Sequence, residues 1–239
     1  MGKYLKLFKT RADYDAYIAQ GNKGFPIISF CEDNGETYVN QVAPETRIIA
    51  TFNVNSTRLE TKILSSTTSV VKIEIDGVEL PEVVTGYTFQ TTGEHEVKYT
   101  LKDETKIADY TFISCSCLKS VRIPKNVTEI GVGAFHSCLA LSSVSFYSNI
   151  ADIKSYAFAF CTNLESIYIP SNVKHLGDSV FSGCGKLKSI TSLALTPPTI
   201  QNNTFADIAN DGTLHVHKES DYNIWMDCLG KSGWVISYM

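Results

Sequence analysis

The stretch Phe112-Ile-Ser-Cys-Ser-Cys117 places two thiols one residue apart, at Cys115 and Cys117. Closely spaced cysteines can bind a metal ion or exchange a disulfide, although structural zinc sites usually pair cysteines separated by about two to four residues. A cysteine buried beside an aromatic ring behaves instead as a small hydrophobic residue. The choice between these chemistries depends on the elements that carry the two thiols.

His215 and His217 form a second pair with possible chemistry. Alternate side chains of a strand lie on the same side, so the two imidazoles could bind one metal ion together. No third ligand can be identified from the sequence, and we expect a solvated strand face. The other histidines are isolated in the sequence: His95, His136 and His175.

Motifs of catalysis and nucleotide binding are missing from the sequence. It contains no G-x-S-x-G, no H-E-x-x-H, no P-loop and no G-x-G-x-x-G that opens a helix after a strand. Acidic pairs such as Glu32-Asp33 and Asp103-Glu104 fall in predicted turns. We therefore expect no enzyme activity, no cofactor and no metal centre.

The composition excludes two further classes of function. The net charge of −4 and the 19% of charged residues are ordinary for a folded globular protein. No basic stripe indicates nucleic-acid binding, and no apolar run approaches the ~20 residues of a membrane-spanning helix. The N-terminal sequence M-G-K-Y-L-K-L-F-K-T-R lacks the continuous apolar region of a secretory signal. We expect a cytoplasmic chain if Met1 is native, or one that begins after a removed leader.

A repeat of 23 residues begins at Ile107 and supplies the elements that position the cysteines. Its units cover 107–129, 130–152, 153–175 and 176–199, and a degenerate fifth unit starts at Ile200. One column holds phenylalanine in all five units: Phe112, Phe135, Phe158, Phe181 and Phe205. A second column holds cysteine in the first four units: Cys115, Cys138, Cys161 and Cys184. Leucine, β-branched and Ile/Val columns follow in the same register: Leu118, Leu141, Leu164, Leu187; Val121, Val144, Ile167, Ile190; Val127, Ile150, Val173.

Each unit predicts two short strands and a tight turn. Residues 118–123 alternate as a half-buried strand does, and Pro124 ends it because proline cannot donate to a strand ladder. Residues 127–130 predict a second short strand, and Ala-Phe-x-x-Cys at 134–138 has the spacing of one turn of α- or 3₁₀-helix. One unit cannot bury its apolar face alone, but stacked units can.

These residues resemble the BspA-like class of leucine-rich repeats, whose pattern is roughly L-x-x-I-x-I-P-x-x-V-x-x-I-G-x-x-A-F-x-x-C. The resemblance is close over 107–199, and residues 196–222 resemble the closing segment of that class, a strand followed by a short helix near a tryptophan. Tyr147 stands where proline is usual, and the fourth unit loses its Ile-Pro ending. The resemblance implies a mainly β leucine-rich-repeat solenoid of about five 23-residue coils with short helical turns.

Two segments without the repeat precede the solenoid. Residues 1–45 predict a small α+β segment, with a helix after Thr10 and a strand at 25–30 that returns as a hairpin at 36–40. Residues 46–106 predict a β-sandwich-like module that caps the N-terminal edge of the repeats. Its expected strands are 47–54, 59–64, 70–75, 87–90 and 95–101, with a tight turn at Asp76-Gly77. Residues 200–239 form the degenerate repeat and C-terminal cap.

The repeat also assigns the cysteines. Stacking would align the column cysteines in a buried ladder, one in each coil, which favours a packing role over metal binding or disulfides. Cys117 lies outside every column, and we expect it near the surface. Cys31 and Cys228 have no assigned partner.

The outward positions of the repeat strands form the candidate binding surface, because solenoids present such faces to ligands. The candidate residues are Ser120, Arg122, Ser143, Ser145, Tyr147, Ser166, Tyr168, Ser189 and Thr191. Tyrosine and arginine are frequent anchors of interfaces. A plain solvated sheet explains the same pattern equally well.

The resemblance implies a non-enzymatic binding module of a bacterial cell-surface or adhesion protein, at the cell surface or secreted. Its partner would be a protein or glycan ligand and not a nucleic acid. Two alternatives stand beside it: a structural component of a larger assembly, and an intracellular scaffold for protein interactions.

Overall fold

The structure is a computed structural model that describes residues 29–31, 37–39, 46–146, 149–192, 194–201, 203–229 and 233–239. The chain divides into two units, Met1–Glu45 and Thr46–Met239. In the first unit, β1 (Ser29–Cys31) and β2 (Thr37–Val39) pair in antiparallel fashion, which confirms the predicted hairpin. The predicted helix after Thr10 lies outside the described residues.

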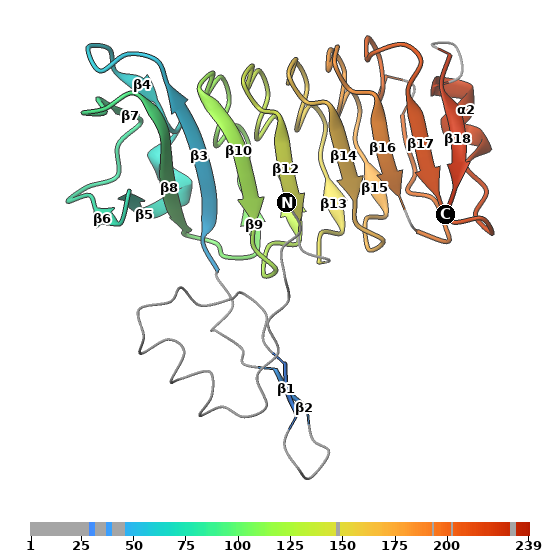
Figure 1. The fold of residues 1–239 in the computed structure, drawn as a ribbon, viewed down its shortest axis with the longest axis horizontal. Coiled ribbons are helices and arrows are strands. Elements are labelled where there is room, and N and C mark those ends of the chain that lie inside the picture. The colour runs from blue at the N-terminus through green and yellow to red at the C-terminus, as the bar shows by residue number, and fades with distance from the viewer. Residues whose placement is uncertain are drawn as a thin grey trace. The chain divides into compact units, whose positions relative to one another are not determined.

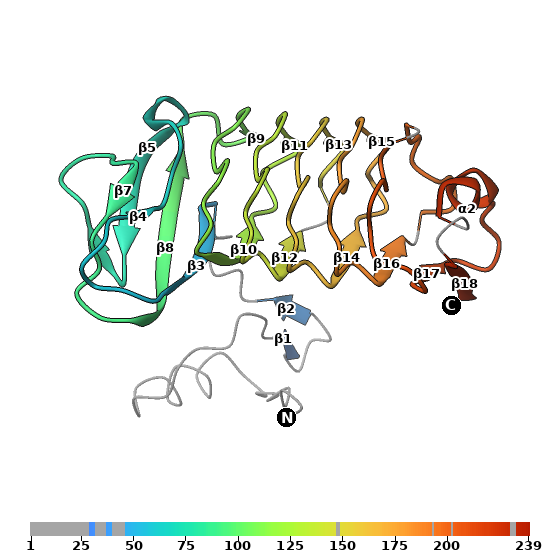
Figure 2. The same cartoon turned by 90° about the horizontal axis from the view of Figure 1, so that it is seen from above.

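The second unit contains the solenoid, in which the repeat units 107–129, 130–152, 153–175 and 176–199 are coils 1 to 4. Each coil contributes one strand to each of two rows, which lie on opposite sides of the stack (Figures 1 and 2). The first row consists of β10 (Leu118–Ile123), β12 (Ser143–Phe146), β14 (Ser166–Ile169), β16 (Ser189–Ser192), β17 (Thr213–Val216) and β18 (Val235–Tyr238). The second row consists of β9 (Lys106–Ile107), β11 (Glu129–Ile130), β13 (Asp152–Ile153) and β15 (His175–Leu176). Both predicted strands of the repeat are thus confirmed.

The core between the two rows is a column of phenylalanine rings. Phe112, Phe135, Phe158, Phe181 and Phe205 stack with nearly parallel planes, at centroid distances of 5.1, 5.2, 5.8 and 5.9 Å. Tyr99 closes the N-terminal end with an edge contact of 5.0 Å to Phe112, and Trp225 closes the C-terminal end 5.2 Å from Phe205. Burial of such rings is the main stabilising term, because each removes a large apolar surface from water.

The helical turn predicted at 134–138 is wrong. Phe135 donates its amide to the Ala157 carbonyl of the next coil, and Ser137 donates to Ala159, both at 2.8 Å. Gly133 and Ser137 have positive φ values of 57° and 58°, and such left-handed residues interrupt a right-handed helix. The segment is therefore a run of short turns that hydrogen-bonds alternately within its coil and to the neighbouring coil.

The residues before the solenoid continue its first row of strands. The order in the six-stranded sheet is β12-β10-β3-β8-β5-β6, in which β3 (Ile48–Val54) runs antiparallel to β10. The remaining members are β5 (Val70–Ile75), β6 (Val78–Glu79) and β8 (Gly93–Leu101). β3 of this module therefore covers the N-terminal edge of the first row of strands.

The second layer of the predicted sandwich is small. It holds the antiparallel pair β4 (Thr61–Lys62) and β7 (Gly86–Tyr87). The 3₁₀ turn η1 (Thr67–Ser69) follows β4, and the chain around these elements is irregular. Residues 59–64 do not form the expected long strand, because Ile63 and Leu64 are both fully buried and break the alternation. The hydroxyl of Tyr99 in β8 donates to the Ile63 carbonyl at 2.6 Å and ties the two layers together.

The C-terminal cap contains the predicted strand and helix and one further strand. β17 is followed by α2 (Asn223–Leu229), whose Trp225 donates its ring N–H to the Pro198 carbonyl at 2.9 Å. β18 was not predicted, and it pairs in parallel with β17. Within the described ranges, no helix has the length and apolar character needed to cross a membrane.

Candidate binding surfaces

The outward positions of β10, β12, β14 and β16 form two columns, which we call the sheet face. Ser120 lies opposite Ser143 and Arg122 opposite Ser145 between β10 and β12. Ser166 lies opposite Ser189 and Tyr168 opposite Thr191 between β14 and β16. Five of these side chains are exposed: Arg122, Ser143, Ser145, Ser166 and Tyr168. Ser120, Ser189 and Thr191 are half-buried, and Tyr147 lies outside the described residues.

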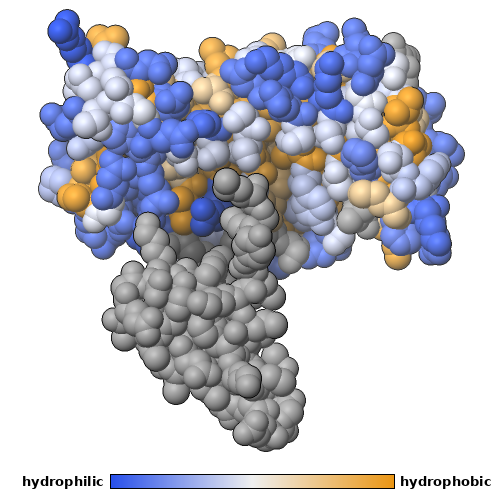
Figure 3. Space-filling model, viewed as in Figure 1, coloured by the Kyte–Doolittle hydropathy of each residue, from blue (hydrophilic) through white to orange (hydrophobic). Residues whose placement is uncertain are grey.

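Neighbouring strands lengthen both columns of the sheet face. Thr51 and Ile49 of β3 lie opposite Ser120 and Arg122, and Thr213 and His215 of β17 lie opposite Ser189 and Thr191. The sequence repeat could not predict the β3 positions, because β3 lies outside the repeat and pairs antiparallel to β10. In Figure 3 this side of the molecule is mainly hydrophilic or intermediate, with scattered hydrophobic patches.

The column cysteines form the expected buried ladder. Cys115, Cys138, Cys161 and Cys184 are free thiols with no exposed surface. Burial raises the pKa of all four thiols, to about 12 for Cys138 and Cys184. Cys117 is half-buried and packs against the core, outside the fully buried ladder. In the described part of the chain, no three His, Cys, Asp or Glu side chains come together as metal ligands.

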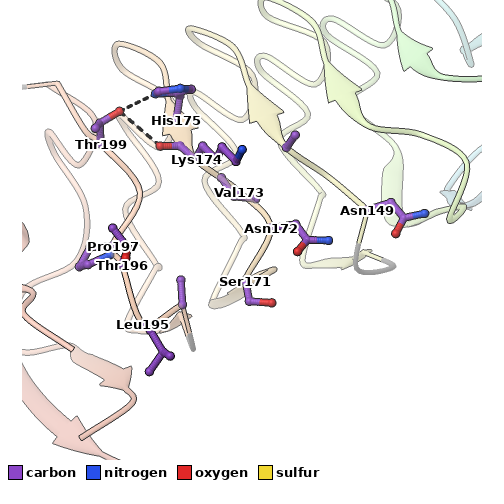
Figure 4. A pocket seen from close by; sticks show the side chains of 12 residues that line it. Asn149, Ser171, Asn172, Val173, Lys174, His175, Leu195, Thr196, Pro197 and Thr199 are labelled. Atoms are coloured by element: carbon purple, nitrogen blue, oxygen red, sulfur yellow. Dashed lines mark hydrogen bonds between the residues drawn. The ribbon is translucent and has the colours of Figure 1, made fainter. Parts of the chain in front are cut away.

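A groove opens between the loops of coils 3 and 4, beyond the ends of β14 and β16 (Figure 4). Its volume is about 860 Å³, and it is lined by residues 171–175, 194–197 and Thr199, together with Asn149 and Ala151 of coil 2. Figure 4 shows Leu195 and Asn172 on different coils, and His175 bonded to Thr199 at the opposite end of the groove from Leu195. Sequence reasoning missed this groove, although the loss of the Ile-Pro ending in coil 4 was its visible signal.

The sequence of this repeat region matches a known family model. Residues 82–210 match the BspA type leucine rich repeat region, in 6 copies. The chain belongs to the BspA-type leucine-rich repeat family. The match begins at residue 82, upstream of the predicted first coil, in the chain between β6 and β7.

Solved structures of other leucine-rich repeat proteins resemble parts of the chain. A T. pallidum leucine-rich repeat protein is 26% identical over 46% of this chain and 51% of its own, with a TM-score of 0.41. A leucine-rich repeat protein from Bacteroides capillosus is 29% identical over 45% and 72%, with a TM-score of 0.34. A leucine rich cell surface protein from Faecalibacterium prausnitzii is 23% identical over 56% and 43%, with a TM-score of 0.32. The chain thus spans about half the length of the T. pallidum protein. No curated protein matches it significantly.

The turn edge of the BspA-type coils carries exposed aromatic rings. Tyr110, Tyr156 and Phe160 are 51%, 44% and 47% exposed, and all three have positive φ values near 60°. A Cβ atom on Gly133 would lie 2.7 Å from the Tyr110 ring, and one on Gly183 would lie 2.6 Å from the Phe160 ring. Each glycine therefore makes room for the aromatic side chain of the preceding coil.

Proposed function

We propose that this BspA-type chain is a non-enzymatic recognition module of a bacterial surface protein, and that the sheet face contacts a protein or glycan ligand. The observation that carries the proposal is the alignment of the two outward columns across β10 and β12 and across β14 and β16. Small hydroxyl side chains leave the backbone ridges accessible, while Arg122 and Tyr168 stand out as large exposed groups. Tyrosine and arginine supply much of the binding energy at interfaces.

Arrays of glycans and of surface proteins, probed with the labelled chain, test this proposal. The variants Arg122→Ala and Tyr168→Ala should each weaken binding of a captured ligand by about tenfold, since truncating an anchor commonly costs more than 1 kcal/mol. Tyr156→Ala is the matched control, because Tyr156 is 44% exposed against 45% for Tyr168 but lies on the turn edge. A ligand that binds all four proteins equally would remove the sheet face as the site.

A second candidate function, assembly into a larger structure, is favoured by the last strand of the first row. β18 lies at the edge of its sheet, and Val235, Tyr238 and Met239 are 58%, 62% and 55% exposed. Edge strands without charges or proline are prone to pair with another chain. Antiparallel pairing of two copies about Ser237 would place Ile236 opposite Tyr238 and Val235 opposite Met239, so each apolar side chain would meet an apolar partner.

Sedimentation velocity over a range of concentrations tests the assembly candidate. Self-pairing through β18 predicts a dimer that Tyr238→Lys converts to a monomer, because a charge on an edge strand opposes pairing. A wild-type chain that stays monomeric throughout leaves recognition through the sheet face as the remaining proposal.

A further inference from the structure

Asparagine side chains tie the loops of successive coils together along one edge of the solenoid. Asn126 donates its side-chain amide to the Glu104 carbonyl at 2.5 Å, and Asn149 donates to the Lys125 carbonyl at 2.6 Å. Asn149 thus bonds coil 2 to coil 1, and Asn126 bonds coil 1 to the segment that precedes it. Asn172 holds the same column position in coil 3. The loops of the first coils are therefore held at the spacing of the stack.

Coil 4 lacks this tie. The column position one period after Asn172 is Leu195, whose side chain has no hydrogen-bond donor and is 63% exposed. Pro197 and Pro198 follow, and neither has a backbone N–H. Among the described residues, no donor reaches the Ser171 carbonyl, which is where the ladder bond from position 195 would end.

Coils 3 and 4 remain hydrogen-bonded to each other farther along the chain, at Thr199. This contact forms the fixed base of the groove. Thr199 donates its amide to the Lys174 carbonyl at 2.9 Å, and its hydroxyl lies 2.8 Å from His175 Nδ1. The open groove beside this contact has a volume of about 860 Å³. That volume lies within the range of about 300–1,000 Å³ that is typical of ligand sites.

We propose that this groove binds an extended peptide segment of a partner protein in which acidic and aliphatic side chains alternate. An extended segment can donate a backbone N–H to the Ser171 carbonyl and accept from Thr196, whose N–H and hydroxyl have no partner among the described residues. It would replace the missing tie between coils 3 and 4. This site lies on the loop edge and is independent of the proposed ligand contact at the sheet face.

The lining of the groove selects the side chains of the segment. The apolar lining is aliphatic, with Leu195 and Pro197 on one wall, and among the described residues no Phe, Tyr or Trp ring lines the groove for a sugar to stack on. No Asp or Glu of the described part of the chain lines the groove. Lys174 is exposed and has no ion pair in the described part of the chain, while Asp152 lies opposite His175 in the β13–β15 register. A ligand therefore meets an unpaired cation beside an aliphatic wall.

Methyl and amide NMR titration of the full chain tests the proposal with defined peptides. The probe is Ac-Glu-Val-Glu-Leu-NH₂, the charge-reversed comparison is Ac-Lys-Val-Lys-Leu-NH₂, and cellobiose is the sugar comparison. We expect the acidic peptide to shift signals of both walls, at 171–175 and 194–199, at up to millimolar concentration. Absence of such shifts, equal shifts with the lysine peptide, or larger shifts with cellobiose would each overturn the proposal.

Three variants sharpen the test. Lys174→Glu should weaken the acidic peptide about two- to fivefold, the change that corresponds to an exposed ion pair. Leu195→Asn restores the donor of the ladder, should close the groove onto the Ser171 carbonyl, and should weaken binding by tenfold or more. Leu195→Ala removes the aliphatic contact without supplying the donor and should give an intermediate loss. Unchanged affinity in Leu195→Asn, with a well-dispersed spectrum, contradicts the groove as the site. Because the signals are resolved by residue, failure here leaves the sheet-face test unaffected.

Discussion

The thiol of Cys138 donates a hydrogen bond to the Phe112 carbonyl of the preceding coil, with 3.1 Å between sulfur and oxygen. Cys161 and Cys184 repeat the arrangement with Phe135 and Phe158, at 3.2 Å each. Cysteine in this column therefore fills a small apolar space and satisfies a buried carbonyl that the neighbouring turn leaves partly free. This repeated bond explains why cysteine recurs at this column in coils 2 to 4.

The thiols should differ sharply in reactivity. Burial raises the pKa of Cys115, Cys138, Cys161 and Cys184, and a thiol reacts through its thiolate. In the native chain near pH 8 we expect these four to be alkylated roughly a hundredfold or more slowly than the half-buried Cys117 and Cys228. Peptide mapping by mass spectrometry after timed labelling measures the rates. Equal rates at Cys117 and Cys138 would contradict the ladder.

Two glycines two residues apart should respond in opposite ways to alanine. Gly183 has a φ of 74°, and its added Cβ would lie 2.6 Å from the Phe160 ring, so Gly183→Ala should lower the free energy of unfolding by about 1–3 kcal/mol. Gly185 is outside the left-handed region and would meet no atom within 4 Å. Gly185→Ala should be neutral or stabilising by up to about 1 kcal/mol. Urea unfolding followed by circular dichroism compares them, and a similar loss in both variants argues against the glycine–aromatic contact.

Stability should depend on pH through His95. Burial opposes the charged form of His95, but hydrogen bonds to Asp76 and Thr91 and the charge of Asp76 together raise its pKa above 6.5. Its Nδ1 lies 2.6 Å from Asp76 Oδ2. A raised folded pKa stabilises the fold fully below the unfolded value of about 6.5, and that contribution is lost as the pH rises through the folded value.

Asp76→Asn separates this effect from other titrations. Asn keeps the positive φ of 49° and an acceptor for the Glu96 amide, but removes the charge that faces His95. The difference in unfolding free energy between wild type and variant should be largest near pH 5.5 and shrink toward pH 9. A difference that stays constant across this range means that His95 does not titrate with folding.

Chelators should leave the melting temperature unchanged. His215 lies on the sheet face opposite Thr191, while His217 Nδ1 accepts a hydrogen bond from the Glu219 amide, so the two imidazoles are differently engaged. A structural zinc site would contribute on the order of 10 kcal/mol to folding. Differential scanning fluorimetry with and without EDTA makes the comparison. A large drop in melting temperature would reinstate a metal site.

The periodic part of the fold could be predicted because residues at the same position of successive repeat units lie in the same structural environment. Phe158 stacks on Phe135 and Phe181 for the same reason that each of them stacks on its own neighbours. The register of β10 with β12 follows from the same period, and it places Arg122 beside Ser145 as expected. Because each coil repeats the one before it, the burial, the strand pairing and the outward positions of one coil predict those of the next.

Three features could not be predicted, each for a different physical reason. The left-handed residues Ser137 and Phe160 are not glycines, so composition did not reveal the turns they form. The pairing of β3 with β10 joins segments with no shared pattern. The groove lies where Leu195 has no side-chain hydrogen-bond donor. The importance of that donor becomes clear only from the bonds that Asn126 and Asn149 make at the same column.

The antiparallel entry of β3 has a consequence for how the length of such chains can change. A further parallel coil cannot be added before β10, because β3 already occupies that edge in the opposite direction. Inside the stack, however, removing 130–152 would bring Phe112 onto Phe158, and duplicating it would insert one more ring between the same neighbours. We expect the length of the solenoid to vary in whole coils from its interior, with Tyr99 and Trp225 kept as fixed ends.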